Sequence, residues 1–370
     1  MSVLRRIGIA AAAASAPVGL AYRFALIYRV RAGYPRRNPP SQTPTDLGLA
    51  YRSLDIESGD GRLPAWFIPA RDGRPGPGVV LVHGWESARD RTLPMAVFLH
   101  AAGFHCLTFD VRGHGANPAE TLPLSAGEFG ADTAAAFRAL VDQPEVTTGA
   151  IAGHSMGAIG AILAAAATPG VAAVVATSAP ADPYRLTRQT FRIARLPIPD
   201  LIAYPLAWLT TRVYLRPRNH KVADISASVA IGRYDGPILL AHGDADVVVP
   251  SSHMDRLAIA ARRMRGGRRR PVETLLVKEG QHSWLYENAG YRGTVAAFLA
   301  RSLGGPFDPP DAAARAEAIA AERIPDGEVE FAAVESNAGG LRTLADVALP
   351  ARSPRPVSPA VDTAIPGDRF

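Results

Sequence analysis

The sequence TTGAIAGHSMGAIGAILAAAA occupies residues 147–167 and changes character at its centre. Thr147–Ala152 predicts a short buried strand, and Met156–Ala167 predicts a helix without a break. Ser155 falls on the turn between them, where its backbone would be strained and where glycines two residues to either side let neighbouring chains pass closely. Strain of this kind usually persists for a functional reason, although a serine here could also be an ordinary helix N-cap.

Strand and helix patterns alternate along the chain from residue 46 to about residue 304. A hairpin is predicted at 47–69, followed by strands at 78–82, 104–109, 171–178, 237–243 and 272–277, and by helices at 88–102, 125–142, 251–265 and 287–301. The sequence SAGE at 125–128 is a capping box that opens one of these helices. Such alternation predicts an α/β fold, in which a mostly parallel central sheet carries helices on both faces.

Two of the predicted strands end in loops that carry an acid and a base. Asp244 and Asp246 follow one strand, and His282 follows the next. Active sites in parallel sheets lie at the carboxyl ends of the strands. A serine hydroxyl is a poor nucleophile, so it needs a base, an acid that orients the base, and a site for the developing oxyanion. We therefore predict Ser155 as the nucleophile, His282 as the base and Asp246 as the acid. Asp244 remains the alternative acid.

The oxyanion site is expected to come from two backbone N–H groups. One belongs to Met156, directly after the nucleophile, and the other to Trp85, in the loop after an earlier strand. No pair of histidines or acids has metal-ligand spacing, so we expect no catalytic metal, and nothing indicates a cofactor. The remaining histidines near strand ends are expected to shape loops or pack: His83, His114, His154 and His242.

A long insertion separates two of the predicted core strands. Residues 179–236 exceed the usual short connection, and prolines at 197, 199 and 205 would cut them into short helices. Their bulky apolar residues predict a cap at about residues 180–235, over the catalytic mouth, although a simple packing excursion is the alternative. Three cap aromatics are predicted to bind substrate: Tyr204, Trp208 and Tyr214.

Arginines in this insertion are spaced three, four and three residues apart, so a helix would align them along one face: Arg185, Arg188, Arg192 and Arg195. This stripe is either a solvated surface or a surface that meets anionic lipid headgroups or a phosphate-bearing leaving group.

Both ends of the chain differ from the middle. Residues 1–45 carry seven arginines and no acidic residue. Within them, residues 7–28 form an apolar run, broken by Arg23, that predicts a membrane anchor; a signal peptide cleaved near Tyr22 and a peripheral segment are the alternatives. Residues 305–370 are rich in proline, alanine and acids and are predicted to be largely disordered, apart from a possible helix at 311–323.

The formal net charge of +6 does not indicate a nucleic-acid partner. Lysine occurs only at Lys221 and Lys278, so the arginine bias is typical of a codon preference rather than of phosphate recognition. The single cysteine, Cys106, excludes an internal disulfide.

Five motifs in this order resemble the α/β-hydrolase superfamily: VHGW at 82–85, DVRGHG at 110–115, GHSMG at 153–157, HGDAD at 242–246 and GQHS at 280–283. More narrowly, residues 46–304 resemble the capped serine-hydrolase branch that includes lysophospholipase-like and serine-aminopeptidase-like proteins. The resemblance implies the α/β-hydrolase fold with a helical cap. It also implies the roles given above to Ser155, Asp246, His282, Trp85 and Met156.

We therefore expect a serine hydrolase of carboxylic esters or thioesters, acting through an acyl-enzyme on a small-molecule or lipid-like substrate. An aminopeptidase or amidase is one alternative, and a membrane-tethered binding protein without catalysis is another. The N-terminal run predicts association with a bacterial-type inner membrane, on a side that the sequence leaves open, or export after signal cleavage.

Overall fold

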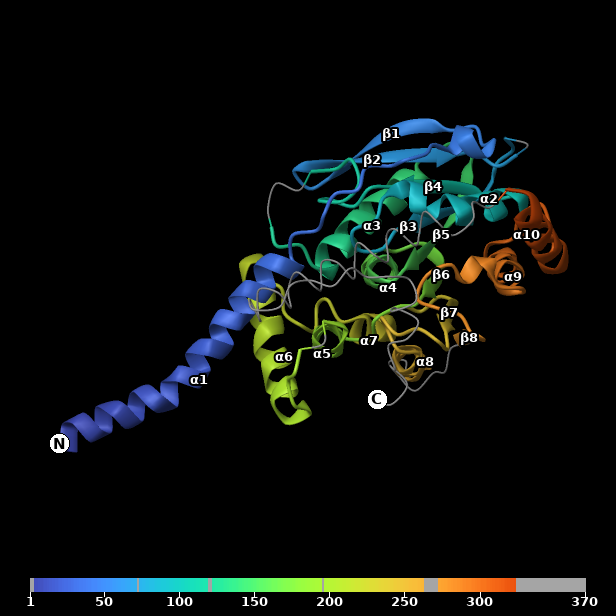
Figure 1. Cartoon of the computed structure of the whole chain (residues 1–370). Helices are drawn as coiled ribbons and strands as arrows, with labels where there is room; N and C mark the ends of the chain where they lie inside the picture. Colours follow the sequence, from blue (N-terminus) through green and yellow to red (C-terminus); the bar gives the residue numbers. More distant parts are fainter. Residues whose placement is uncertain (1–2, 72, 119–121, 195, 263–271, 324–370) are drawn as a thin grey trace.

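A mostly parallel sheet forms the centre of the molecule (Figure 1). The computed structural model describes residues 3–71, 73–118, 122–194, 196–262 and 272–323. Within these residues, eight strands lie in the order β1-β2-β4-β3-β5-β6-β7-β8; β2 is antiparallel to β1 and β4, and the other neighbouring pairs are parallel. The strands are β1 Arg52–Ser58, β2 Gly61–Ile68, β3 Gly76–Val82, β4 His105–Phe109, β5 Val146–His154, β6 Val171–Thr177, β7 Ile238–Gly243 and β8 Val272–Val277.

Helices cover both faces of this sheet, as the alternating pattern predicts. Each face buries a separate apolar core, one around Phe129 and Phe137 and the other around Phe98 and Phe298. The first face carries α3 (Ala126–Val141), α4 (Met156–Ala167) and α8 (Ser252–Arg262), and the second carries α2 (Leu93–Ala101) and α9 (Tyr291–Leu303).

Local signals in the sequence explain most of these boundaries. The predicted capping box opens α3, because the Ser125 hydroxyl accepts a hydrogen bond from the N–H of Gly127 while the Ser125 N–H donates to Glu128 at 2.7 Å. The predicted hairpin is present as β1 and β2. Its first strand begins later than residue 47, however, since Pro44–Leu47 form a 3-10 turn.

The insertion at residues 179–236 folds into a helical cap. Pro197 and Pro199 separate its first two helices, as predicted, but Pro205 lies inside the second and does not end it. Pro205 and Leu201 are both exposed, so water can bond the carbonyl that the missing N–H leaves free. The helices are α5 Pro183–Ile193, α6 Asp200–Leu215 and α7 Ala227–Ala230, with 3-10 turns at Arg216–Arg218 and Ile231–Arg233.

The last turns of the N-terminal helix α1 (Val3–Ala32) pack against the cap helix α6. Phe24 and Tyr28 lie edge-on to Phe191 of α5, with ring centroids 5.5 and 5.8 Å away. Tyr28 is buried, and its hydroxyl is hydrogen-bonded to that of Thr190 at 3.0 Å. The last turns of α1 are therefore docked on the cap.

The first half of α1 projects away from the body of the molecule (Figure 1). Two apolar side chains just past the middle of α1, Val18 and Leu20, are 67% and 69% exposed. Among the residues that the structure describes, no helix is long and apolar enough to cross a membrane, and the predicted transmembrane anchor finds no support.

The C-terminal region contributes a helix to the second core. α10 (Pro309–Arg323) packs against α9 and α2, and its Ala312 and Ala316 are fully buried. Glu317 accepts a hydrogen bond from the Gly293 N–H at 2.7 Å. The helix predicted at 311–323 is therefore present and is part of the folded body. Residues 324–370, predicted to be disordered, lie outside the described residues.

Removing the chain up to Arg36 should destabilise the protein, because Phe24 and Tyr28 then no longer cover Phe191. Burial of an aromatic side chain stabilises by about 1.5–3 kcal/mol, so the free energy of unfolding should fall by about 3 kcal/mol or more. A chain that begins at Tyr22 keeps both rings and is the control. Equal melting temperatures for the two shortened proteins would show that α1 contributes nothing to stability.

Candidate active site

Ser155 occupies a strained turn between β5 and α4. Its φ of 53° lies in the left-handed region, where residues other than glycine are uncommon. Its N–H donates to the carbonyl of Thr177 on β6 at 2.9 Å, which fixes the turn against the neighbouring strand. The Ser155 side chain makes no capping hydrogen bond, so the N-cap alternative does not hold.

Two glycines make this turn possible. A Cβ atom on Gly153 would lie 2.3 Å from the carbonyl oxygen of Gly157, and one on Gly157 would lie 2.3 Å from the carbonyl oxygen of Val82 on β3. Both contacts are with backbone, which cannot rotate aside. Glycine is therefore required at both positions, as the GHSMG sequence indicates.

Three predicted residues meet at the carboxyl ends of β5, β7 and β8. The Oγ atom of Ser155 lies 3.0 Å from Nε2 of His282, and Nδ1 of His282 lies 2.8 Å from Oδ2 of Asp246. Because a carboxylate only accepts hydrogen bonds, Nδ1 carries the proton, and Nε2 is left to accept one from the serine. The three side chains form a continuous row, called the catalytic row below.

Asp246 is a buried carboxylate with a full set of donors. Its Oδ1 accepts the N–H groups of Val248 and Val249 at 2.9 and 2.8 Å, and its Oδ2 also lies 3.2 Å from Nε2 of His242. Burial alone would raise the pKa of Asp246, but the charges and hydrogen bonds of His282 and His242 outweigh it and hold that pKa well below its usual range.

Asp244, the alternative acid, has a different position. It is exposed, and its Oδ1 accepts the N–H of Glu279 at 2.6 Å. Asp244 thereby joins the loop after β7 to the loop after β8. The structure gives it no contact with His282.

Two residues outside the predicted site hold the loop of His282. The carbonyl oxygen of His282 accepts a hydrogen bond from the hydroxyl of Ser178 at 2.9 Å and lies 2.8 Å from Nε2 of His154. Burial lowers the pKa of His154 to about 4, so this ring is neutral at pH 7 and donates through Nε2–H. His154 was expected only to pack, and the sole sequence signal for Ser178 is its place directly after β6.

The loop after β3 passes beside Ser155. A Cβ atom on Gly84 would lie 3.6 Å from Cβ of Ser155, and Trp85 follows Gly84 directly. Met156 opens α4, and the first N–H groups of a helix have no partner within it. The backbone of both predicted oxyanion donors is therefore close to Ser155.

A segment between α1 and β1 supports this loop from outside. The N–H of Arg36 donates to the carboxylate of Glu86 at 3.1 Å, and the side-chain amide of Asn38 donates to the Glu86 carbonyl at 2.7 Å. The N–H of Ser41 donates to Asp90 at 2.7 Å. Residues 36–41 therefore contribute to the surroundings of the candidate site.

The histidines of the β3 and β4 loops are structural in their contacts. Nε2 of His83 accepts the N–H of Val111 at 3.1 Å, and its Nδ1 donates to the carbonyl of Gly84 at 2.7 Å, which joins the two loops as expected. His114 is fully buried, and burial lowers its pKa to about 3. Among the described residues, no group of three or more His, Cys, Asp and Glu side chains is placed to hold a metal ion.

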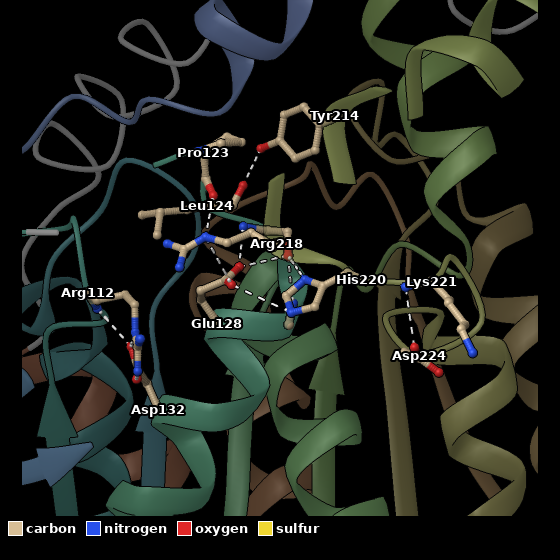
Figure 2. A network of polar contacts seen from close by, with 12 residues as sticks. Arg112, Pro123, Leu124, Glu128, Asp132, Tyr214, Arg218, His220, Lys221 and Asp224 are labelled. Atoms are coloured by element: carbon tan, nitrogen blue, oxygen red, sulfur yellow. Dashed lines mark hydrogen bonds and ion pairs between the residues drawn. The ribbon is translucent and has the colours of Figure 1, made fainter. Parts of the chain in front are cut away.

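A polar network fastens the cap to the body of the protein (Figure 2). Glu128, at the start of α3, lies 3.5 Å from Nε of Arg218 and 3.7 Å from Nε2 of His220. Arg218 also donates to the carbonyl of Pro123 at 2.9 Å. On the catalytic side, Gln189 of α5 donates to the carbonyl of Val247, next to Asp246, at 2.9 Å.

The cap aromatics predicted to bind substrate lie in different surroundings. The hydroxyl of Tyr214 donates to the carbonyl of Leu124 (Figure 2), and burial raises the pKa of Tyr214 well above its usual range. Tyr214 thus belongs to the network that fastens the cap. Tyr204 lines a cavity within the cap, and Trp208 is half-exposed without lining it.

The arginine stripe is partly neutralised. Arg185, Arg188 and Arg192 lie on α5, but Asp200 at the start of α6 pairs with Arg188 at 2.8 Å and with Arg192 at 3.2 Å. Arg195 lies outside the described residues. The spacing alone predicts a uniformly basic face on α5. Because Asp200 pairs with two of its arginines, α5 does not have such a face.

Known proteins resemble this chain in sequence and in fold. Residues 73–229, which include Ser155 but neither Asp246 nor His282, match the family described as serine aminopeptidase, S33. An uncharacterised protein of Mycobacterium tuberculosis is 31% identical over 242 residues, which span 64% of this chain and 74% of that protein. An esterase of Pyrococcus furiosus has a TM-score of 0.59 at 22% identity, over 73% of this chain and 98% of the esterase.

The chain has the α/β-hydrolase fold, and it belongs to the same family as the uncharacterised M. tuberculosis protein. A second solved α/β-hydrolase, a puromycin-hydrolysing peptidase of M. tuberculosis, has a TM-score of 0.55 at 22% identity, over 72% of this chain and 41% of the peptidase. The fold shared with these two structures is the predicted one. This α/β-hydrolase is thus similar in fold both to an esterase and to a peptidase.

Lowering the pH should reduce the free energy of unfolding of this protein already at pH values above those at which carboxylates titrate. Burial lowers the pKa of His253 and of His154 to about 4, whereas an unfolded histidine titrates near 6.5. A lowered folded pKa gives stability that is complete above pH 6.5 and is lost as the pH falls. Each such histidine should remove about 2 kcal/mol by pH 5.

The His253→Asn variant tests this linkage, because an amide oxygen can still accept the N–H of Ala181 that Nδ1 of His253 accepts at 2.9 Å. Chemical denaturation at pH 7 and pH 5 should show a smaller pH dependence for the variant, by about 2 kcal/mol. The same slope in both proteins would exclude a contribution from His253.

Proposed function

We propose that this α/β-hydrolase is a serine hydrolase that cleaves carboxylic esters or thioesters through an acyl-enzyme. The catalytic row at a strained turn is the observation that carries the proposal. Packing alone requires neither a buried ionised acid nor a serine with a left-handed backbone in contact with a histidine. A binding protein without catalysis would have no use for the combination.

In this mechanism, Nε2 of His282 takes the proton of Ser155 as the serine oxygen attacks the acyl carbonyl. The charge that forms on His282 lies beside the carboxylate of Asp246. His282 then gives the proton to the departing oxygen or sulfur, and the acyl group stays on Ser155. A water molecule, deprotonated by the same His282, releases the acid and restores the serine.

The N–H groups of Met156 and Trp85 are proposed to bind the oxyanion of each tetrahedral intermediate. The position of Gly84 against Cβ of Ser155 supports Trp85 in this role. Removing one such donor usually costs about 10²–10³ in rate, but only proline removes a backbone N–H, and it also constrains the backbone. The roles of Ser155 and Asp246 are easier to test.

An aminopeptidase is the second candidate, because the sequence matches the family of that description. Such an enzyme must bind a protonated amine, which requires a free carboxylate near the nucleophile. Among the described residues that line the cap cavity, Asp182 instead carries the single carboxylate, and that group pairs with Arg185 at 3.2 Å. The basic surroundings favour neutral or anionic acyl substrates over cationic ones.

Ser155→Ala and His282→Ala should each lower ester hydrolysis by about 10⁴-fold or more, and the double variant should lose little further, because the residues act as a unit. Asp246→Asn should be nearly as severe. Asp244→Asn is the matched control and should have a mild effect, since Asp244 contacts a backbone N–H and not His282. A larger loss from Asp244→Asn would reverse the assignment of the acid.

Substrate class can be measured with a matched pair, a p-nitrophenyl acyl ester and an aminoacyl p-nitroanilide. The proposal expects higher kcat/KM for the ester and covalent labelling of Ser155 by a fluorophosphonate. Faster turnover of the anilide would support the aminopeptidase. Failure of the intact protein to label would support a binding protein.

We further propose that the exposed apolar residues of α1 and α6 meet the surface of an anionic lipid bilayer. Leu201 and Trp208 of α6 are 87% and 51% exposed. Helix α6 packs beside α1, in which Leu20 is also exposed. The arginines of residues 1–45 supply a matching positive charge.

A Leu201→Glu, Trp208→Glu variant should pellet less with vesicles of phosphatidylglycerol and phosphatidylcholine than the unchanged protein. Ile259→Glu is the control, because Ile259 is 52% exposed on α8, away from both helices. Equal sedimentation of all three proteins would exclude this surface.

A further inference from the structure

A cavity of about 860 Å³ lies within the cap, between α5, α6 and residues 220–229. None of Ser155, Asp246 and His282 lines it, so it is distinct from the catalytic row. A volume of this size is typical of a site for a small molecule or a lipid chain.

Basic side chains dominate the charged part of the cavity lining. Arg185, Arg188, Arg212 and Lys221 line it, against the carboxylate of Asp182. That carboxylate already pairs with Arg185 and accepts the Arg185 N–H, which caps α5. Arg188 is paired with Asp200, as described above. The remaining positive charge of the cavity therefore comes from Arg212 and Lys221.

Arg212 and Lys221 have no carboxylate within 4 Å in the part of the chain that the structure describes. The guanidinium of Arg212 lies over the ring of Trp208, 3.8 Å from its centroid, and 5.4 Å from the centroid of Tyr184. Stacking positions a guanidinium by its face and leaves its N–H edge able to bond an anion. Asp224 accepts the backbone N–H of Lys221 (Figure 2), and this bond leaves the side-chain ammonium available.

The rest of the cavity lining is largely apolar and aromatic. It includes Tyr184, Tyr204, Ala207, Leu215, Val222 and Val229. An apolar wall beside two cations without acidic partners suits a ligand with an alkyl chain and an anionic head.

The cavity is close to the catalytic row along the chain. Asp182, which lines it, is four residues after Ser178, whose hydroxyl holds the carbonyl of His282. Four residues span at most about 14 Å. Gln189 also joins α5 to the backbone next to Asp246. The cavity lining and the residue that holds the His282 loop are therefore less than the length of one long acyl chain apart.

We propose that this cavity binds the anionic headgroup of a single-chain amphiphile, through Arg212 and Lys221, and that the amphiphile is a substrate. Only the second half of this statement rests on the proposed hydrolase function. The chemistry recognised is a phosphate or carboxylate attached to an acyl chain.

The first test measures binding without catalysis. Ser155→Ala protein is titrated with oleoyl lysophosphatidate and with mono-oleoylglycerol, which share an acyl ester and differ in the phosphate. Lysophosphatidate should bind more tightly, and adding Arg212→Gln or Lys221→Gln should weaken it about tenfold or more, as expected for loss of a charge-assisted hydrogen bond. Inorganic phosphate should compete only weakly with lysophosphatidate if the acyl chain also contributes to binding.

Arg216→Gln is the matched control, because it removes the same charge from an exposed cap residue that does not line the cavity. Equal weakening by Arg216→Gln and Arg212→Gln would reduce the effect to general electrostatics and overturn the proposal. So would equal binding of the two amphiphiles. Circular dichroism checks that each variant is folded.

The second test measures hydrolysis of both amphiphiles by protein with an intact Ser155. Arg212→Gln and Lys221→Gln should lower kcat/KM for lysophosphatidate about tenfold and leave that for mono-oleoylglycerol unchanged. If neither amphiphile is hydrolysed while Arg212-dependent binding persists, the anion site stands and its role as a substrate site is wrong. Hydrolysis of both with no dependence on Arg212 would overturn the site and leave the hydrolase function intact.

Discussion

The geometry of the candidate site depends on the close approach of the Ser155 turn to the end of β3. Gly157 packs against the carbonyl of Val82 with no room for a side chain, which brings Gly84 and Trp85 beside the nucleophile. The same turn bonds to Thr177 on the other side, and the next residue, Ser178, holds the His282 loop. One backbone contact thus aligns the loops of Ser155 and His282 with the N–H groups that we propose as oxyanion donors.

Much of this arrangement could be predicted from sequence because its signals are local. Strand ends are marked by changes in periodicity, and parallel strands bring Ser155, Asp246 and His282 to one edge whatever their separation. Sequence distinguishes Asp246 from Asp244 only by offset, since the burial of Asp246 and its contact with His282 are tertiary properties. The contact of His154 with the carbonyl of His282 could not be predicted from the sequence, because every residue has a backbone carbonyl.

Both ends of the folded chain pack against its body for a shared physical reason. Composition describes all residues of a segment together, whereas packing against the body depends on the residues of one helix face. Phe24 and Tyr28 are four residues apart and so lie on one side of α1, and Ala312 and Ala316 have the same spacing in α10. Each pair packs against the folded body although the surrounding residues resemble an anchor or a tail.

These docked ends also determine which part of the cap can move. The start of the cap is tied to the acid loop by Gln189, and its far end is tied to α3 by the Glu128 network. α1 covers Phe191 between these two attachments. At the start of α6, Asp200, Leu201 and Tyr204 are exposed, and Arg188 joins Asp200 and Tyr204 to α5. Motion that admits a substrate is therefore expected there, beside the cavity and next to the exposed Leu201, rather than as a rotation of the whole cap.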